Sequence, residues 1–398
     1  MTHPSPGAGA DAARSDSLPE PCSPAAAGRV AAGRWRGEVV YLYAFDVAYD
    51  MKREPVERLL GQSAAPFRID TDRRSPRRLS FHQPQTFHLP PVERGGPHGR
   101  VRLERTVKLL PVGAISITVR VPFDVPRIEE LVLYHDLRFA EGSLAEDVQK
   151  LAEETRRELE PFCIRPVPQL TDEEAYTVFC LEAPLADEGG APVNAEAWLA
   201  AHRRQIAAVL TQEPDAESLS QQEAEESTGR YLTYYQNDMV VIDWDAALLV
   251  DDRAHFSETL YLMELANLQL AELEAYDRLL DGALDRAYRD LSGPSVRRGS
   301  QVLRELRELR IDLARVSEEL SNITKFFGDW HLARIYEHVA ARFHLADWNR
   351  TIDAKLKTLD GIYEILKHDQ TNRMMLLLET TIVLLFIIDL VVLISGKG

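Results

Sequence analysis

The sequence predicts an α+β protein: an N-terminal, mainly antiparallel sheet domain with helices, a long coiled-coil-like helical hairpin, and a C-terminal transmembrane helix. Up to residue 250, the order of strand-like and helix-like segments is typical of a largely antiparallel α+β domain. Beyond residue 250, apolar residues recur at spacings of four and three, and the chain then becomes almost entirely apolar. The predicted parts are a disordered leader (1–34), an α+β domain (35–250), a helical coiled-coil region (251–373) and a transmembrane anchor (374–396).

Composition excludes several classes of protein. The formal net charge of −17 argues against a dedicated nucleic-acid binder, because phosphate binding needs a positive surface. Cys22, Cys163 and Cys180 have no close spacing, which excludes a disulfide framework and a zinc knuckle and fits a reducing compartment. Residues 1–34 are rich in Ala, Pro, Gly and Ser and lack the apolar segment of a secretory signal, so we expect a disordered leader.

Local patterns predict the elements of the α+β domain. Clusters of β-branched and aromatic residues predict strands at 38–47, 101–110, 114–122, 128–139, 174–181 and around 239–244. Apolar periodicity and capping residues predict helices at 55–61, 143–161 and 194–210, with Ser143 as a cap. A loop rich in Pro, Arg and Gly is expected up to about residue 99, and the SxxE pattern at Ser220 indicates a further capped helix.

Two apolar stripes predict the helical hairpin. Both alternate at spacings of four and three, which is the coiled-coil signal, and a Ser-Gly-Pro break at 292–294 separates them. Each stripe is either an intramolecular core or a protomer interface. Gln269 is a polar residue within the first stripe, where it would fix the register of the helices or be partly exposed. The stripes are Leu262, Ala266, Gln269, Leu273, Tyr276, Leu280, Ala283 and Ala287, then Val302, Leu306, Leu309, Leu313, Val316, Leu320, Ile323, Phe327 and Trp330.

The C-terminal apolar segment predicts a membrane span that continues a helix starting near Asp347. From 376 to 395 about 20 residues at ~1.5 Å each match a hydrocarbon core of roughly 30 Å. Glu379 lies near the N-terminal interface, whereas Asp389 lies near the centre, where an acid costs about 2.5–3.5 kcal/mol. We expect Asp389 to face another helix, as an oligomer contact or a proton-sensitive contact; the alternative is a protonated acid that tolerates lipid.

A family likeness rests on three segments in the second half of the chain. They are DMVVIDWDAALL at 238–249, MELANLQLAELEAYDRLLD at 263–281, and an Asp/Trp helix that leads into a short membrane anchor. Together they resemble the Required for Meiotic Nuclear Division family, formerly a domain of unknown function, over roughly residues 38–396. The resemblance implies an inner-membrane protein with its bulk inside the cell. It also implies support of translation or of membrane-protein biogenesis; in the mitochondrial members, which support translation, the bulk lies in the matrix. Because this chain has no convincing transit peptide, we expect a bacterial member.

Three acids are the strongest candidates for enzyme chemistry. Asp243 and Asp245 flank Trp244, and Asp238 lies five residues upstream. On a strand, residues two apart share a face, so the pair suits Mg²⁺ or acid/base work. The alternative, which we favour, is a strand that ends in exposed acids beside an aromatic anchor, because no other metal-binding or nucleophile motif accompanies them.

The stretch 68–108 is basic and contains the densest group of arginines, Arg73, Arg74, Arg77 and Arg78. These residues suit anionic lipid headgroups or contact with the ribosome or RNA, and the alternative is an ordinary solvated loop.

The sequence as a whole indicates a non-enzymatic scaffold that self-associates through its helices, possesses no cofactor and shows no evident small-molecule substrate. We expect a single span in the cell inner membrane with the bulk cytoplasmic, and a homo-oligomer. The alternatives are a metal-dependent hydrolase that uses Asp238, Asp243 and Asp245, and a proton-sensitive regulatory membrane subunit. The interaction candidates are Asp389, Glu379, Gln269, Trp244 and the four arginines.

Overall fold

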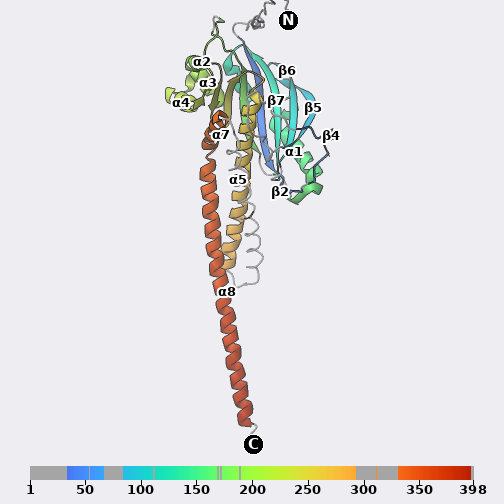
Figure 1. The fold of residues 1–398 in the computed structure, drawn as a ribbon, viewed down its shortest axis with the longest axis vertical. Coiled ribbons are helices and arrows are strands. Elements are labelled where there is room, and N and C mark those ends of the chain that lie inside the picture. Colours follow the sequence, from blue (N-terminus) through green and yellow to red (C-terminus); the bar gives the residue numbers. More distant parts are fainter. Residues whose placement is uncertain are drawn as a thin grey trace, which may run out of the picture. The chain divides into compact units, whose positions relative to one another are not determined.

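An eight-stranded sheet organises the computed structural model, which describes residues 34–52, 54–66, 84–110, 113–167, 170, 173–187, 190–292, 311 and 330–395 (Figure 1). The strand order is β12-β13-β14-β11-β1-β7-β6-β5. Neighbouring strands pair antiparallel except β11 and β14, which are parallel, so the prediction of an α+β fold with a largely antiparallel sheet is confirmed. The strands are β1 (Trp35–Asp46), β5 (Gln85–Gly96), β6 (Gly99–Leu109), β7 (Ala114–Val125), β11 (Glu174–Glu182), β12 (Tyr231–Leu232), β13 (Met239–Ile242) and β14 (Ala246–Asp251).

Short strand pairs and helices surround this sheet. The pairs are β2 (Ala48–Met51) with β10 (Cys163–Pro166), β3 (Arg58–Leu59) with β4 (Gln62–Ser63), and β8 (Arg138–Phe139) with β9 (Gly142–Ser143). The α-helices are α1 (Leu144–Leu159), α2 (Ala195–Ala201), α3 (Arg203–Leu210), α4 (Gln221–Thr228), α5 (Phe256–Ser292), α7 (Trp330–Arg342) and α8 (Leu345–Ser395). The 3-10 helices are η1 (Ile128–Tyr134), η2 (Glu160–Phe162) and η3 (Ala216–Ser218).

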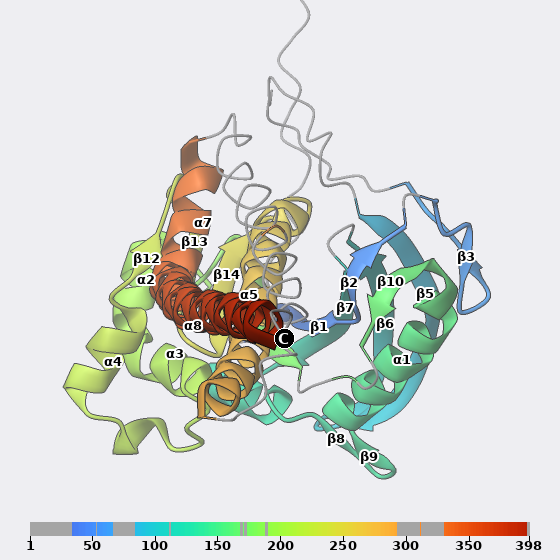
Figure 2. The ribbon, with the colours of Figure 1, turned by 90° about the horizontal axis from the view of Figure 1, so that it is seen from below.

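The central strand β1 is buried on both faces and separates two hydrophobic cores. Its residues alternate between the faces, so Val39, Tyr41 and Tyr43 join the core with α1, α2, α3 and η1. Val40 and Leu42 join the core with α5, α7 and α8. Figure 2 shows α1 inside the curve of the sheet and α5 and α8 on its other side.

The predicted helix caps are confirmed. The Ser143 hydroxyl accepts a hydrogen bond from the backbone N–H of Glu146 (3.2 Å) at the start of α1, whose apolar residues Leu144, Val148, Leu151 and Leu159 are buried. The Ser220 hydroxyl accepts one from the N–H of Glu223 (3.0 Å) at the start of α4. Each cap satisfies an N–H group that the first helical turn leaves without a partner. The predicted helix 194–210 is divided at His202 into α2 and α3.

Three predictions in the N-terminal domain are wrong. Residues 128–134 form a 3-10 helix instead of a strand, because Ile128, Leu131 and Tyr134 recur every three residues and are all buried. Residues 58–63 form the β3–β4 hairpin instead of a helix. The predicted loop up to residue 99 contains β5, an edge strand whose prolines at 90 and 91 coincide with a register shift against β6.

The first predicted stripe lies inside the molecule, on α5. All eight of its residues are buried, and several pack against α7 and α8. Residues 302–310 and 312–329 of the second stripe lie outside the described residues, so the coiled-coil hairpin is not confirmed. The residues of α8 in this core are Leu345, Ile352, Leu356, Leu359, Ile362 and Tyr363.

Helix α8 is continuous over 51 residues and links the core to the apolar end of the chain. Its segment Met374–Ser395 is the one described helix that is long and apolar enough to cross a membrane, with a mean hydropathy of 2.7 and none of its residues buried. The expectation that the Asp/Trp helix continues directly into the apolar segment is confirmed. The predicted domain limits stay predictions.

A buried ion pair connects the C-terminal end of α7 to the sheet. The Arg342 guanidinium donates to Asp243 in the β13–β14 turn, and their side chains are only 11% and 6% exposed. Arg342 also lies over the Trp244 ring, 5.8 Å from its centroid, and His344 stacks on that ring. The hydroxyl of Tyr176 donates to the Asp243 carbonyl (3.0 Å), so strand β11 takes part in the same junction.

We predict that Asp243→Ala lowers the free energy of unfolding by about 3–5 kcal/mol, because it leaves the buried Arg342 charge unpaired. Asp245→Ala is the matched control: this neighbouring acid is exposed, and its loss should change stability by less than about 0.5 kcal/mol. Denaturant unfolding followed by tryptophan fluorescence measures both. Equal, small losses in the two variants would show that the ion pair does not hold α7.

Candidate functional site

The sheet has a polar area on the face that carries α5, and this area is built by β5, β6 and β7. Along β6 the residues alternate between the buried Leu103, Val107 and Leu109 and a polar set on the opposite face. Strand pairing aligns the polar sets in rows. One row is His88, Thr106 and Thr118, the next is Thr86, Lys108 and Ser116, and Glu104 faces Arg120 in a third.

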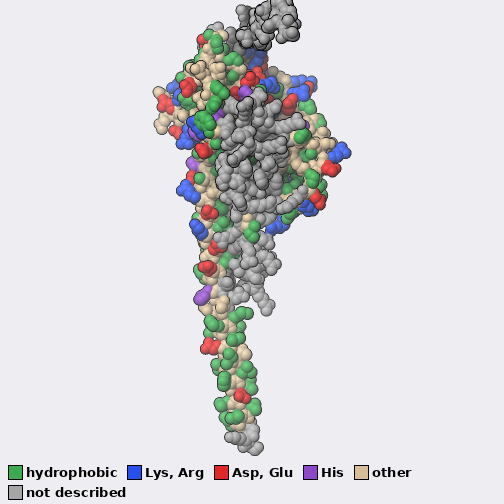
Figure 3. Space-filling view, viewed as in Figure 1, with side chains coloured by type: hydrophobic (Ala, Val, Ile, Leu, Met, Phe, Trp, Pro, Cys, Tyr) green, Lys and Arg blue, Asp and Glu red, His purple; other side chains and the backbone are tan. Residues whose placement is uncertain are grey.

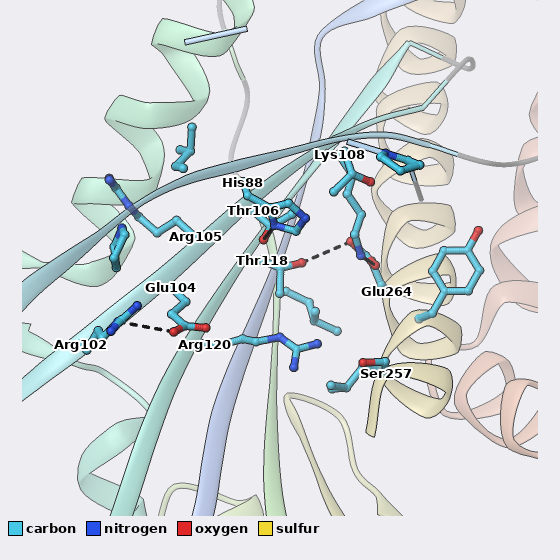
Figure 4. A pocket seen from close by; sticks show the side chains of 17 residues that line it. His88, Arg102, Glu104, Arg105, Thr106, Lys108, Thr118, Arg120, Ser257 and Glu264 are labelled. Carbon is cyan, nitrogen blue, oxygen red and sulfur yellow. Dashed lines mark hydrogen bonds and ion pairs between the residues drawn. The ribbon is translucent and has the colours of Figure 1, made fainter. Parts of the chain in front are cut away.

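A pocket of about 570 Å³ lies between this polar area and the beginning of α5 (Figure 4). The wall on α5 is formed by Ser257, Leu260, Tyr261 and Glu264, which the spacing of three and four places on one helix face. Helix α5 packs on β11, β1 and β7, and the polar area continues beyond it toward the edge strand β5. We refer to this cavity as the polar pocket.

Glu264 connects the two walls of the polar pocket. Its carboxylate accepts hydrogen bonds from the Ser116 hydroxyl (2.6 Å) and the Thr118 hydroxyl (3.3 Å), and it forms an ion pair with Lys108. The Lys108 ammonium also lies 5.8 Å from the centre of the Tyr261 ring. Burial, reinforced by the Glu264 charge, raises the pKa of Tyr261, which keeps this phenol neutral. The negative charge of Glu264 is thus satisfied by the protein itself.

Arginines occupy the more open side of the polar pocket. Arg120 donates to Glu38 (2.9 Å) and is one-third exposed, while Arg102 pairs with Glu104 (3.4 Å) and is 61% exposed. Arg105 belongs to the lining, but Figure 4 shows its side chain directed toward α1, where the acids Asp147 and Glu154 lie. Burial, together with the charge of Arg94, lowers the pKa of Arg105.

A second polar group lies where β1 and β11 meet the middle of α5. Burial raises the pKa of the Asp46 carboxyl to about 6. Burial and a hydrogen bond with the Glu274 carboxyl raise the pKa of Glu174 to about 8, so Glu174 keeps its proton at neutral pH. The Arg278 charge opposes both shifts. Two carboxyls that share a proton fit a structural contact between the sheet and α5.

The acids of the predicted hydrolase are engaged in local structure. The Asp238 carboxylate accepts from the backbone N–H groups of Tyr234 (2.6 Å) and Tyr235 (3.0 Å). Asp243 is paired with Arg342, and Asp245 is exposed. Strand β13 ends at Ile242, so residues 243–245 form a turn. The prediction that Asp243 and Asp245 share one face of a strand is therefore wrong. Within the described ranges, no group of three or more His, Cys, Asp or Glu side chains could hold a metal ion.

The interaction candidates lie in different parts of the molecule. Gln269 is buried and accepts from the Tyr336 hydroxyl of α7, so it connects two helices of one chain. Trp244 lies 53% exposed in the β13–β14 turn, and Glu379 and Asp389 are exposed on the apolar part of α8. The structure brings none of these residues to the polar pocket. Arg73, Arg74, Arg77 and Arg78 lie outside the described residues.

Sequence reasoning missed the polar pocket because its residues come from distant segments without a local motif. The alternation of polar and apolar residues at 101–109 was the available signal, since it predicts a strand with one polar face. The prolines and glycines of β5 predict a loop, and a loop gives no reason to place His88 and Thr86 beside the polar face of β6.

Comparison with known proteins changes the family assignment. A family model described as the N-terminal domain of the uncharacterized protein MJ0711 matches residues 36–257, more than half of the chain. The uncharacterized protein MJ0711 of Methanocaldococcus jannaschii is 24% identical over 161 residues, which are 40% of this chain and 50% of the relative. The chain thus spans about half the length of the curated relative that it matches. No solved structure gives a significant match.

The predicted resemblance to the Required for Meiotic Nuclear Division family is wrong, because the matching model belongs to another family. The three segments of that resemblance are the β13–β14 hairpin, helix α5 and helix α8, and the apolar patterns of the first two follow from packing in the core. By the match over residues 36–257, the chain belongs to the family of the MJ0711 N-terminal domain.

Proposed function

We propose that this protein is a non-enzymatic scaffold that α8 anchors in a membrane. The proposal is based on one observation: the same helix, α8, packs in the core of the folded part and forms the apolar C-terminal segment. The first turns of α8 contribute Ile352, Leu356 and Leu359 to the core beside α5. The same helix continues as the apolar segment Met374–Ser395.

The exposure of this apolar segment supports a membrane location. None of its residues is buried in the protein, and Figure 3 shows mainly hydrophobic side chains on the visible face of this part of α8. Its 22 residues correspond to ~33 Å of helix, enough to cross a hydrocarbon core of roughly 30 Å. A lipid environment removes this apolar surface from water.

The charges before the span support a cytoplasmic position for the folded part. Lys357, Lys367 and Arg373 lie within about 20 residues of the span, the distance over which positive residues favour the cytoplasmic side. The buried cysteines Cys163 and Cys180 are free thiols, which agrees with a reducing compartment. We therefore propose a single-pass protein of the cell inner membrane with its bulk in the cytoplasm.

Self-association is the second part of the proposal, and it rests on Asp389. The stripe on α5 is covered by α7 and α8 of the same chain, so it is not offered to another protomer. Asp389 lies within the apolar segment, where an acid is costly unless another helix supplies a polar contact. A second copy of the span brings a second Asp389 to the same depth. The hydrolase and proton-sensor alternatives stay predictions.

Membrane anchoring predicts the outcome of alkaline carbonate extraction of the full chain. The wild type should stay in the membrane pellet, whereas the triple variant Leu384→Arg, Leu385→Arg and Ile388→Arg should be extracted, because each central Arg costs about 2.5–3.5 kcal/mol. The matched control places three arginines at exposed α8 positions before the span. It consists of Thr358→Arg, Gly361→Arg and Glu364→Arg and should behave as the wild type. Extraction of the wild type would refute anchoring by α8.

Self-association through Asp389 predicts a change in mass in detergent. Light scattering should give a dimer or larger assembly for the wild type, and Asp389→Leu should weaken it by about 0.6–2 kcal/mol, the range for polar contacts between membrane helices. Glu379→Leu removes the acid near the interface and should retain the wild-type mass. A monomeric wild type, or the same mass for wild type and Asp389→Leu at every concentration, would contradict this part of the proposal.

A further inference from the structure

We propose that the polar pocket binds a small, soluble molecule that carries a phosphate or pyrophosphate group. The phosphate chemistry of this inference does not depend on the membrane anchor, and only the choice of a soluble ligand over a lipid headgroup rests on that part of the proposed function. The inference starts from a difference between the two halves of one sheet face. Where α5 packs on the central residues of β1 and β11 the face is apolar, with Val40, Leu42 and Val178 in the core. On β5, β6 and β7 the same face is polar and borders a cavity.

The side chains around this cavity include several hydrogen-bond donors. The Thr106 hydroxyl and His88 lie within 3.2 Å of each other, whereas the Thr86 hydroxyl donates to the Pro84 carbonyl (3.4 Å) and the Thr118 hydroxyl to Glu264 (3.3 Å). Lys108 is held at the inner end by Glu264. The Thr106 hydroxyl and the cations of the lining together match the acceptor oxygens of a phosphate group.

Among these donors, Arg120 gives the most direct support for a phosphate ligand. A guanidinium has five N–H groups, and Glu38 accepts from one terminal nitrogen of Arg120 at 2.9 Å. This contact fixes the direction of the side chain while one-third of it stays exposed toward the cavity. An arginine held in place by an acid on one side can offer a planar pair of donors to an oxyanion on the other.

The two carboxylates that line the polar pocket do not repel a phosphate group, because each is paired with a cation of the protein. Glu264 accepts from Ser116 and Thr118 and pairs with Lys108, and Glu104 pairs with Arg102. Both carboxylates are therefore compensated by the protein. The volume of about 570 Å³ falls within the roughly 300–1,000 Å³ of small-molecule sites.

The position of the cavity favours a soluble ligand over a lipid headgroup. Lys355 of α8 pairs with Asp277 of α5 (2.7 Å), and both helices run in the same direction in Figure 1. Along α5, Glu264 of the pocket precedes Asp277 by 13 residues, and along α8, Met374 follows Lys355 by 19 residues. Because Lys355 and Asp277 lie side by side, the pocket and the span are separated by the sum, 32 residues of helix. At ~1.5 Å a residue this is roughly 48 Å, beyond the reach of a headgroup.

Isothermal titration of the full chain in nanodiscs of neutral lipid, with inorganic pyrophosphate as the probe at constant ionic strength, tests the proposal. We expect saturable binding of one pyrophosphate per chain. Arg102→Gln, at an exposed position, should weaken it at least tenfold. The double variant Glu38→Gln with Arg120→Gln should do the same without leaving a buried charge unpaired. The matched control is Arg100→Gln on the same strand, 84% exposed and outside the lining, which should bind as the wild type.

Three results would overturn the proposal. Absence of saturable binding by the wild type would mean that the polar area is an ordinary solvated sheet face. Equal weakening by Arg100→Gln and Arg102→Gln would indicate nonspecific attraction of anions. Pyrophosphate binding that is unchanged in both pocket variants would place the site elsewhere.

Discussion

The packing of α8 against α5 is the contact on which the other features of this protein depend. Ile352, Leu356 and Leu359 lie in the same core as the inner face of α5, and Lys355 pairs with Asp277 and Asp281 of that helix. Since α8 continues without interruption to Ser395, the direction of its apolar segment is set by this core. The folded part is thus joined to the apolar segment by helix and not by a loop, which agrees with the proposed scaffold held in a defined orientation to a bilayer.

The position of α5 also creates the polar pocket. One helix covers β11, β1 and the neighbouring part of β7, and the apolar residues of that half of the sheet are buried beneath it. Beyond its edge, the strands β5 to β7 carry polar side chains, and Glu264 joins the helix to Lys108, Ser116 and Thr118 at the boundary. Anchor and pocket therefore use opposite ends of the α5–α8 pair. For the proposed anchor and the proposed phosphate ligand, this arrangement places the pocket away from the membrane surface.

The features that were predictable from the sequence depend on local interactions. The caps at Ser143 and Ser220 and the stripes of α1 and α5 follow from neighbours within one or two helical turns. The strand β5 was missed because its prolines are acceptable only at the edge of a sheet, and the strand order is decided by distant segments. The turn at 243–245 depends on the pairing of β13 with β14, and the pocket joins residues from 42 to 264, so neither has a local signature.

The central claim is that α8 is one uninterrupted helix from the core to the span, and a distance measurement across the junction tests it most directly. Spin labels at Thr358→Cys and Thr381→Cys, both exposed, with Cys22 replaced by Ser, can be measured by pulsed electron resonance in nanodiscs. The 23 intervening steps at ~1.5 Å predict a narrow distribution near ~35 Å. A broad distribution, or one centred well away from this distance, would show a flexible joint between the folded part and the span and would contradict the account.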